Sequence, residues 1–144
     1  MTSTQESTNK EALRRLNAAL NSGDPHVIST TIDEVFQPDV IIRTPLRVDA
    51  SGSEMMKQLW DVLLRGFPDL HVTVEDVIAE GDKVVSRNTV SGTHRGEYMG
   101  VQPTGKHITW NEIFIGRVAD GRVAETWGVV DVASQMRQLG LVSS

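Results

Sequence analysis

The spacing of apolar residues changes near Gly66, and no other feature of the sequence limits the possible folds as much. Before Gly66, apolar residues recur at intervals of three and four, as on one face of a helix. After it, the segments 70–79, 83–95, 107–118 and 122–130 have strand composition and are separated by glycines. Helices followed by neighbouring strands predict an α+β fold with a mainly antiparallel sheet.

The start of the chain is polar and rich in Ser and Thr over residues 1–7. We therefore expect a mobile leader there, followed by a single domain over 8–144. Ser7 or Thr8 is the expected cap of a first helix, which ends near Gly23.

Two further helices flank a short strand. Asp24 and the proline after it are typical of a helix start, and Pro38 is expected to end this second helix. The β-branched segment 39–44 predicts a strand. Ser53 is the expected cap of the third helix, which carries Trp60 on its apolar face.

Composition narrows the classes of function. The chain is 39% apolar, has a net charge of −5 and contains no cysteine. No segment has the ~20 apolar residues of a membrane span, and no basic stripe suits a nucleic acid, so we expect neither partner. The absence of cysteine and the spacing of the histidines predict that the chain holds no metal cofactor. No secretory signal begins the sequence, so we expect a cytoplasmic protein.

Four motifs suggest a family. FPDL stands at 67–70, GTHRGEYMG at 92–100, QPTGK at 102–106 and DGRV at 120–123, followed by Trp127. With the order of helices and strands, these motifs resemble the SnoaL-like polyketide cyclases, a family of ester cyclases. The resemblance covers nearly the whole chain.

The resemblance implies a cone-shaped α+β barrel of the nuclear transport factor-like type. Its curved, mixed, mainly antiparallel sheet would pack on three N-terminal helices, with a short C-terminal helix and a deep apolar cavity. It also implies a cofactor-free enzyme that acts on a hydrophobic small molecule. Because the fold also hosts non-catalytic binding modules, the fold alone does not decide the function.

Three cavity positions depart from the family's pattern. The cyclases carry their proton-transferring aspartate directly after the tryptophan of the last strand, where this chain has Gly128. Phe114 stands at the position of the cyclase histidine, and Ile42 stands where relatives often have asparagine or tyrosine. Asp131 is a candidate replacement acid, but its place before the last helix favours an N-cap.

Glu112 is the remaining candidate acid or base. Alternation along 107–118 puts Trp110, Glu112 and Phe114 on one face of the strand, where the family's pocket positions fall. Desolvation among aromatic neighbours would raise the pKa of Glu112 and suit it to proton transfer. The competing interpretation is an exposed acid or a structural ion pair.

Arg87 and Thr89 share a face of the strand 83–95. Arg87 matches a pocket arginine of the related epoxide hydrolases, which implies that it orients Glu112 or binds a substrate oxygen. A salt bridge that braces the sheet is the alternative. His94 matches a family histidine and is a candidate either for proton transfer or for fixing the loop at the pocket mouth.

The predicted site therefore has three catalytic candidates, Glu112, Arg87 and His94. Seven further positions are expected to line the cavity and bind the substrate: Ile42, Trp60, Thr89, Trp110, Phe114, Thr126 and Gly128.

Two functions stay open at this point. The first is an enzyme that closes a ring or transfers a proton, or that promotes cycloaddition or isomerisation by positioning alone. The second is a non-catalytic binding or dimerisation module. Epoxide hydrolysis is disfavoured, because Thr89 and Gly128 replace the acids it needs. Val123, Trp127 and Val129 are expected to form an exposed apolar patch that favours a homodimer.

Overall fold

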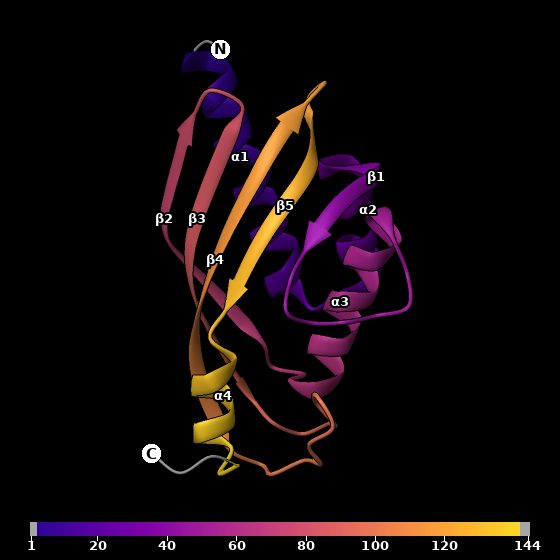
Figure 1. The fold of residues 1–144 in the computed structure, drawn as a ribbon, viewed down its shortest axis with the longest axis vertical. Helices are drawn as coiled ribbons and strands as arrows, with labels where there is room; N and C mark the ends of the chain where they lie inside the picture. The colour runs from indigo at the N-terminus through magenta and orange to yellow at the C-terminus, as the bar shows by residue number, and fades with distance from the viewer. Residues whose placement is uncertain (1–2, 142–144) are drawn as a thin grey trace.

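A curved five-stranded sheet with helices packed against it organises the chain (Figure 1). The computed structural model describes residues 3–141. In chain order the elements are α1 (Ser3–Ser22), α2 (Pro25–Val35), β1 (Phe36–Arg43), α3 (Gly52–Gly66), β2 (His71–Glu80), β3 (Lys83–Thr93), β4 (His107–Ala119), β5 (Arg122–Val130) and α4 (Val132–Gln138).

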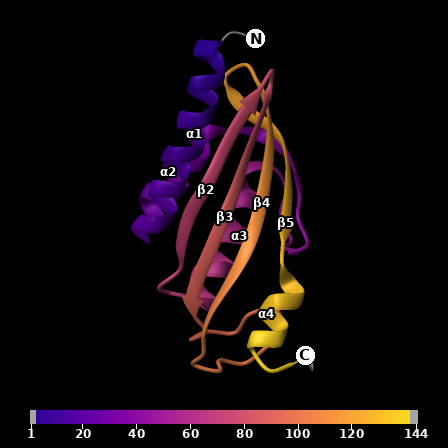
Figure 2. The same ribbon diagram turned by 90° about the vertical axis from the view of Figure 1, so that its left-hand side faces the viewer.

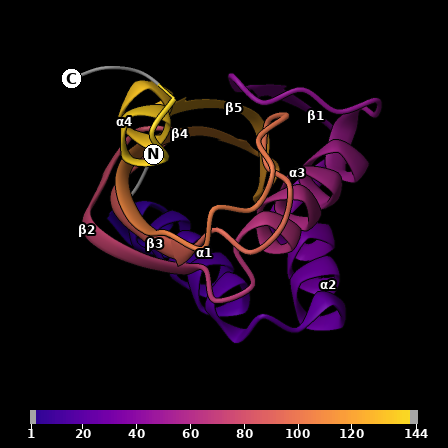
Figure 3. The same cartoon turned by 90° about the horizontal axis from the view of Figure 1, so that it is seen from below.

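The strands lie in the order β1-β5-β4-β3-β2, with β1 parallel to β5 and every other pair antiparallel. The predicted α+β class and mixed, mainly antiparallel sheet are confirmed. Asp120 and Gly121 have φ angles of 53° and 78°, as a tight two-residue hairpin between β4 and β5 requires. Figure 3 shows the sheet curling toward the helices, so that one face is concave.

The first helix begins earlier than the sequence predicted. Residues 3–7, expected in the leader, belong to α1, and residues 1 and 2 lie outside the described residues. Glu6 anchors this first part of the helix, because its Oε2 accepts a hydrogen bond of 2.9 Å from the backbone N–H of Gly81 in the β2–β3 turn. The first turns of the helix are therefore held to the sheet.

The strand β1 also starts earlier than expected, at Phe36 rather than residue 39, and Pro38 lies within it. An edge strand tolerates a proline, and the pairing with β5 shifts between Phe36 and Ile41. Ser51, not Ser53, precedes α3. At Gly52 a Cβ would collide with the Pro38 carbonyl, so this glycine lets α3 begin against β1.

Two clusters of buried side chains fill the space between the sheet and the helices. One lies around Leu16, Ile32 and Phe36, and the other around Phe67, Tyr98 and Trp110. Both clusters pack against Ile42, Trp60 and Leu64, so these three residues lie between them. Figure 2, turned from Figure 1, shows α3 behind the sheet and α4 at the lower end of β5.

The outer face of the sheet carries apolar side chains in one row. Ile78, Val85, Ile115 and Trp127 are paired in register across β2, β3, β4 and β5. The predicted patch is wrong at Val123, which is 2% exposed and belongs to the core, because a bulge between Arg117 and Val118 changes which face of β5 is buried. No helix among residues 3–141 is long and apolar enough to cross a membrane.

Candidate functional site

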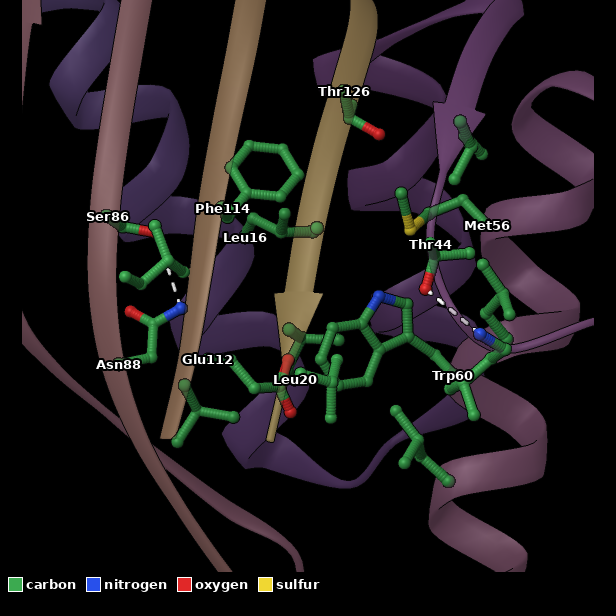
Figure 4. A pocket seen from close by; sticks show the side chains of 18 of the residues that line it. Leu16, Leu20, Thr44, Met56, Trp60, Ser86, Asn88, Glu112, Phe114 and Thr126 are labelled. Atoms are coloured by element: carbon green, nitrogen blue, oxygen red, sulfur yellow. Dashed lines mark hydrogen bonds between the residues drawn. The ribbon is translucent and has the colours of Figure 1, made fainter. Parts of the chain in front are cut away.

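A cavity of about 110 Å³ lies between the concave face of the sheet and helices α1 and α3 (Figure 4). The helices supply apolar side chains to its wall, and all five strands supply the opposite side. The apolar residues from the helices are Leu13, Leu16, Leu20, Met56, Leu59, Trp60 and Leu63.

The polar groups of the cavity gather mainly on the sheet side. Ser86 and Asn88 come from β3, Glu112 from β4 and Thr126 from β5, and all four are labelled in Figure 4. Asn88 lies directly opposite Glu112 in the antiparallel pairing of β3 and β4. Residues opposite each other share a face of the sheet, so the amide and the carboxyl are neighbours on the cavity wall.

Glu112 is held in place by a buried tryptophan. The indole Nε1–H of Trp110 donates to Glu112 Oε2 at 2.8 Å. Desolvation raises the pKa of Glu112 above its ordinary value, and the bond from Trp110 offsets part of this rise because it favours the charged form. The cavity therefore holds one carboxyl group that is protonated more readily than an exposed glutamate.

Trp110 itself does not line the cavity, contrary to its predicted substrate-binding place. It is 2% exposed and packs with Phe67, whose ring centroid lies 5.1 Å away. Trp110 lies two residues before Glu112 on the same face of β4, and its indole N–H holds the Glu112 carboxyl group in place.

Arg87 and Thr89 are not in the cavity, so the prediction that they join Glu112 there is wrong. Arg87 points outward and its Nε donates to Asp76 Oδ2 at 2.7 Å, and Thr89 Oγ1 donates to Glu75 Oε1 at 3.0 Å. Both side chains belong to the odd-numbered residues of β3, whereas the cavity receives the even-numbered ones. Arg87 therefore forms a salt bridge on the sheet, as the alternative interpretation predicted.

His94 is also away from the cavity wall. Its ring is fully buried, and Nδ1 accepts a hydrogen bond of 3.1 Å from the backbone N–H of Thr104. Backbone bonds link His94 to Lys106 and Gly105 as well. These bonds show that His94 fixes the loop between β3 and β4, which was one of its two predicted roles. It does not line the cavity, as a residue that transfers a proton to a substrate would.

The other predicted positions do line the cavity: Ile42, Trp60, Phe114, Thr126 and Gly128. At Gly128 a Cβ would have only the Arg43 carbonyl oxygen nearby, at 3.7 Å. The chain therefore has open space at the position where the resemblance implies an aspartate. Asp131 caps α4, since its side chain accepts from the backbone N–H of Ser134 at 3.0 Å, which confirms the N-cap interpretation.

Six polar residues of the cavity were not predicted: Asn17, Arg43, Thr44, Ser86, Asn88 and Tyr98. Asn17 lies at helical spacing from Leu13 and Leu20, and Ser86 and Asn88 alternate between two buried valines, so the signals were in the sequence. Burial raises the pKa of Tyr98 to about 12, and its hydroxyl donates to Gln135 Oε1 at 3.0 Å. Tyr98 is therefore neutral.

No group of three His, Cys, Asp or Glu side chains suited to a metal ion occurs within residues 3–141.

A family model described as SnoaL-like polyketide cyclase matches residues 10–139. Among solved structures, IdmH from Streptomyces antibioticus, a proposed polyketide cyclase, is 34% identical, covering 92% of this chain and 98% of its own, with a TM-score of 0.77. AclR from Streptomyces galilaeus, a proposed hydroxylase, is 32% identical, covering 96% and 85%, with a TM-score of 0.81.

A SnoaL-like protein from Jannaschia sp. CCS1 is 27% identical, covering 99% of this chain and 98% of its own, with a TM-score of 0.87. Among curated proteins no relative matches this chain.

Proposed function

The chain belongs to the SnoaL-like polyketide cyclase family, and we propose that it is a cofactor-free enzyme in which Glu112 transfers a proton to or from a hydrophobic, polyketide-like substrate. The observation that carries the proposal is the placement of Glu112. It is a carboxyl group on the wall of an apolar cavity, held by Trp110 and with a raised pKa. Such a group is suited to acid and base chemistry closer to neutral pH.

In this proposal the carboxylate form of Glu112 removes a proton from a carbon next to a carbonyl. The electron pair left behind moves to the carbonyl oxygen as an enolate, which attacks an electrophilic carbon of the same substrate and closes a ring. The protonated Glu112 then returns the proton to the product. The hydroxyl groups of Ser86, Thr126 and Thr44 on the wall are available to stabilise the enolate oxygen, whereas Arg87 lies outside the cavity.

The size of the cavity limits how the substrate lies. A cavity of ~150 Å³ in another protein holds one benzene molecule, so about 110 Å³ suits a single ring. We therefore expect the reacting ring inside, and a larger polycycle would require Trp60 or Phe114 to move.

The experiment is a turnover assay of Glu112→Gln on a panel of polyketide methyl esters and epoxides. We expect the rate constant kcat to fall by roughly 10²–10⁴-fold, with little change in binding because the side chains have nearly the same shape. Glu75→Gln, an exposed acid on the outer face of the sheet, is the matched control and should keep full turnover. Undiminished turnover by Glu112→Gln would remove Glu112 as the base.

The alternative is a non-catalytic binding module, and the observation in its favour is Gly128, which leaves the family's aspartate position without an acid. In that case both the wild-type chain and Glu112→Gln would bind panel compounds and neither would turn them over.

We also propose a homodimer that pairs through the outer face of the sheet. Val129 is 65% exposed and Ile113 is 42% exposed there, close to the apolar row described above. Val129→Glu should convert a dimer into a monomer in gel filtration with light scattering. A wild-type chain of monomer mass would contradict the proposal.

A further inference from the structure

The cavity ends at Phe114, although the concave face of the sheet continues beyond this residue. On the inner face of β4, Glu112 and Phe114 line the cavity, whereas Gly116, the next residue on that face, does not. Val118 follows and belongs to the buried cluster around Ile32. In Figure 4 the Phe114 ring lies above the Glu112 carboxyl group and is directed away from it. The ring is therefore the wall that closes this end of the cavity.

The neighbours of Phe114 on the sheet leave the space that its ring fills. A Cβ added at Gly116 would lie 3.2 Å from Phe114 Cε1, so the ring lies over the backbone of this glycine. Gly128 is paired with Phe114 across β4 and β5, and Ser86 is paired with it across β3 and β4. Paired residues share a face of the sheet, so the side chains beside the ring are absent or small. Without the ring, the cavity would extend over Gly116.

Trp60 is the other large ring on the cavity wall, and it lies on the opposite side, on α3. It packs against both buried clusters, whereas Phe114 packs against the first alone. Truncation of Trp60 would therefore disturb both clusters. Truncation of Phe114 would lengthen the cavity along the sheet, toward Thr126, which is paired with Gly116.

The opposite end of the cavity is lined by the second buried cluster. Leu59, Leu63, Val72 and Tyr98 belong to this cluster and line the cavity, and each is at most 6% exposed. Buried clusters of this kind are closely packed and yield little space. A longer ligand therefore gains room more readily at the Phe114 end.

We propose that Phe114 is a specificity-determining residue that limits the cavity to ligands with a single ring and excludes fused polycycles. This inference rests on the proposed function, because it places the reacting ring beside Glu112, two residues before Phe114 on the same face of β4. It narrows the substrate class to monocyclic or open-chain polyketide-like compounds.

The experiment compares phenol and 2-naphthol, which share a hydroxyl group and differ by one fused ring, by isothermal titration calorimetry. The second ring adds apolar area, so 2-naphthol binds more tightly wherever the cavity has room for it. We expect the wild-type chain to bind phenol more tightly. In Phe114→Ala the ratio of the two affinities should shift toward 2-naphthol by about tenfold or more, because the longer cavity then buries the second ring.

Ile115→Ala is the matched control. Ile115 is the next residue on β4, belongs to the apolar row on the outer face and does not line the cavity. This variant should leave the ratio unchanged. Phe114→Leu serves as a second variant should the alanine disturb the fold, because leucine keeps more of the packing. We expect a smaller shift in the same direction.

Tighter binding of 2-naphthol than of phenol by the wild-type chain would overturn the inference, and so would an unchanged ratio in both Phe114 variants. Either result would leave the proposed function intact, since both ligands would still bind in the cavity that Glu112 lines. Failure of both ligands to bind the wild-type chain would also overturn the inference, and the turnover assay of Glu112→Gln would then decide the proposed function separately.

Discussion

The polar side chains on the two faces of β3 differ in how fully they are hydrogen-bonded. On the outer face, Arg87 bonds to Asp76 at 2.7 Å and Thr89 bonds to Glu75 at 3.0 Å. On the inner face, Asn88 bonds to Ser86 and its second polar atom has no partner among the described residues. Neighbouring positions of one strand therefore have satisfied polar groups on one side and an unsatisfied one on the other.

The outer polar pairs brace the sheet, whereas the inner polar side chains line the cavity. The outer pairs are exposed, and such pairs stabilise a protein by only ~0–1 kcal/mol each, but they need nothing from outside the chain. The inner side chains face the cavity instead, where a polar atom without a partner is costly to bury. The predictions below change one face at a time, in order of decreasing effect.

The largest effect is expected from Gly128→Asp, which adds a second carboxyl group to the cavity wall. The backbone leaves room for the Cβ, so the cost comes from desolvation and from repulsion by Glu112, about 1–3 kcal/mol at pH 8. We expect Tm to fall by several degrees in thermal unfolding at pH 8. The fall should shrink as the pH drops, because protonation removes the charge.

Gly128→Ala separates the charge from the side chain and should change Tm little, since its Cβ meets only the Arg43 carbonyl oxygen at 3.7 Å. A loss of stability in Gly128→Asp that did not depend on pH would mean that the added carboxyl group does not lie in the cavity.

A smaller effect is expected from Glu112→Gln on the pH dependence of stability. The folded-state pKa of Glu112 is raised by burial, so the folded chain holds this proton to higher pH than the unfolded chain does. The wild-type chain therefore loses stability as the pH rises from 4.5 through the folded pKa, and the loss is complete above it. Glutamine cannot ionise and avoids this loss.

We expect Glu112→Gln to melt about 2–4 °C higher than the wild-type chain at pH 8, the shift that roughly 1 kcal/mol produces in a domain of this size. At pH 4 the two Tm values should agree. A difference in Tm that stayed the same from pH 4 to pH 8 would contradict a raised pKa.

The smallest effect is expected on the outer face. Arg87→Ala removes an exposed ion pair, which should lower Tm by less than about 2 °C. It should leave kcat/KM unchanged within about twofold, because Arg87 is not in the cavity. Asp76→Ala should cause the same small shift, and the double variant should add little to either. A hundredfold loss of activity in Arg87→Ala would restore Arg87 to the site.

The sequence predicted the fold because the two periods of apolar spacing belong to different elements. Helical spacing before Gly66 and alternation after it correspond to α1–α3 and to β2–β5. The boundaries were less predictable, since Pro38 is compatible with an edge strand and residues 3–7 extend a helix that Glu6 holds to a distant turn.

The site was predictable on β1, β4 and β5, where the resemblance placed Ile42, Phe114 and Gly128 on the cavity wall. The prediction failed on β3, because Arg87 was matched to a relative's arginine although the buried valines of that strand, Val84 and Val90, are even-numbered. A one-residue difference exchanges the two faces of a strand. The role of Trp110 as a support was not visible, because it depends on a contact within the folded strand.

The parallel pairing of β1 with β5 has a consequence for how the chain folds. Arg43 and Glu125 bond across this pair, although 82 residues separate them in sequence. The hairpins of β2 to β5 are local by comparison, and contacts between distant segments carry the larger entropic cost of closing a loop. We expect β2 to β5 to assemble first and β1 to dock last, so the cavity would be completed in the final step of folding. The same edge should open first in native-state hydrogen exchange, with the amides of β1 less protected than those of β3 and β4.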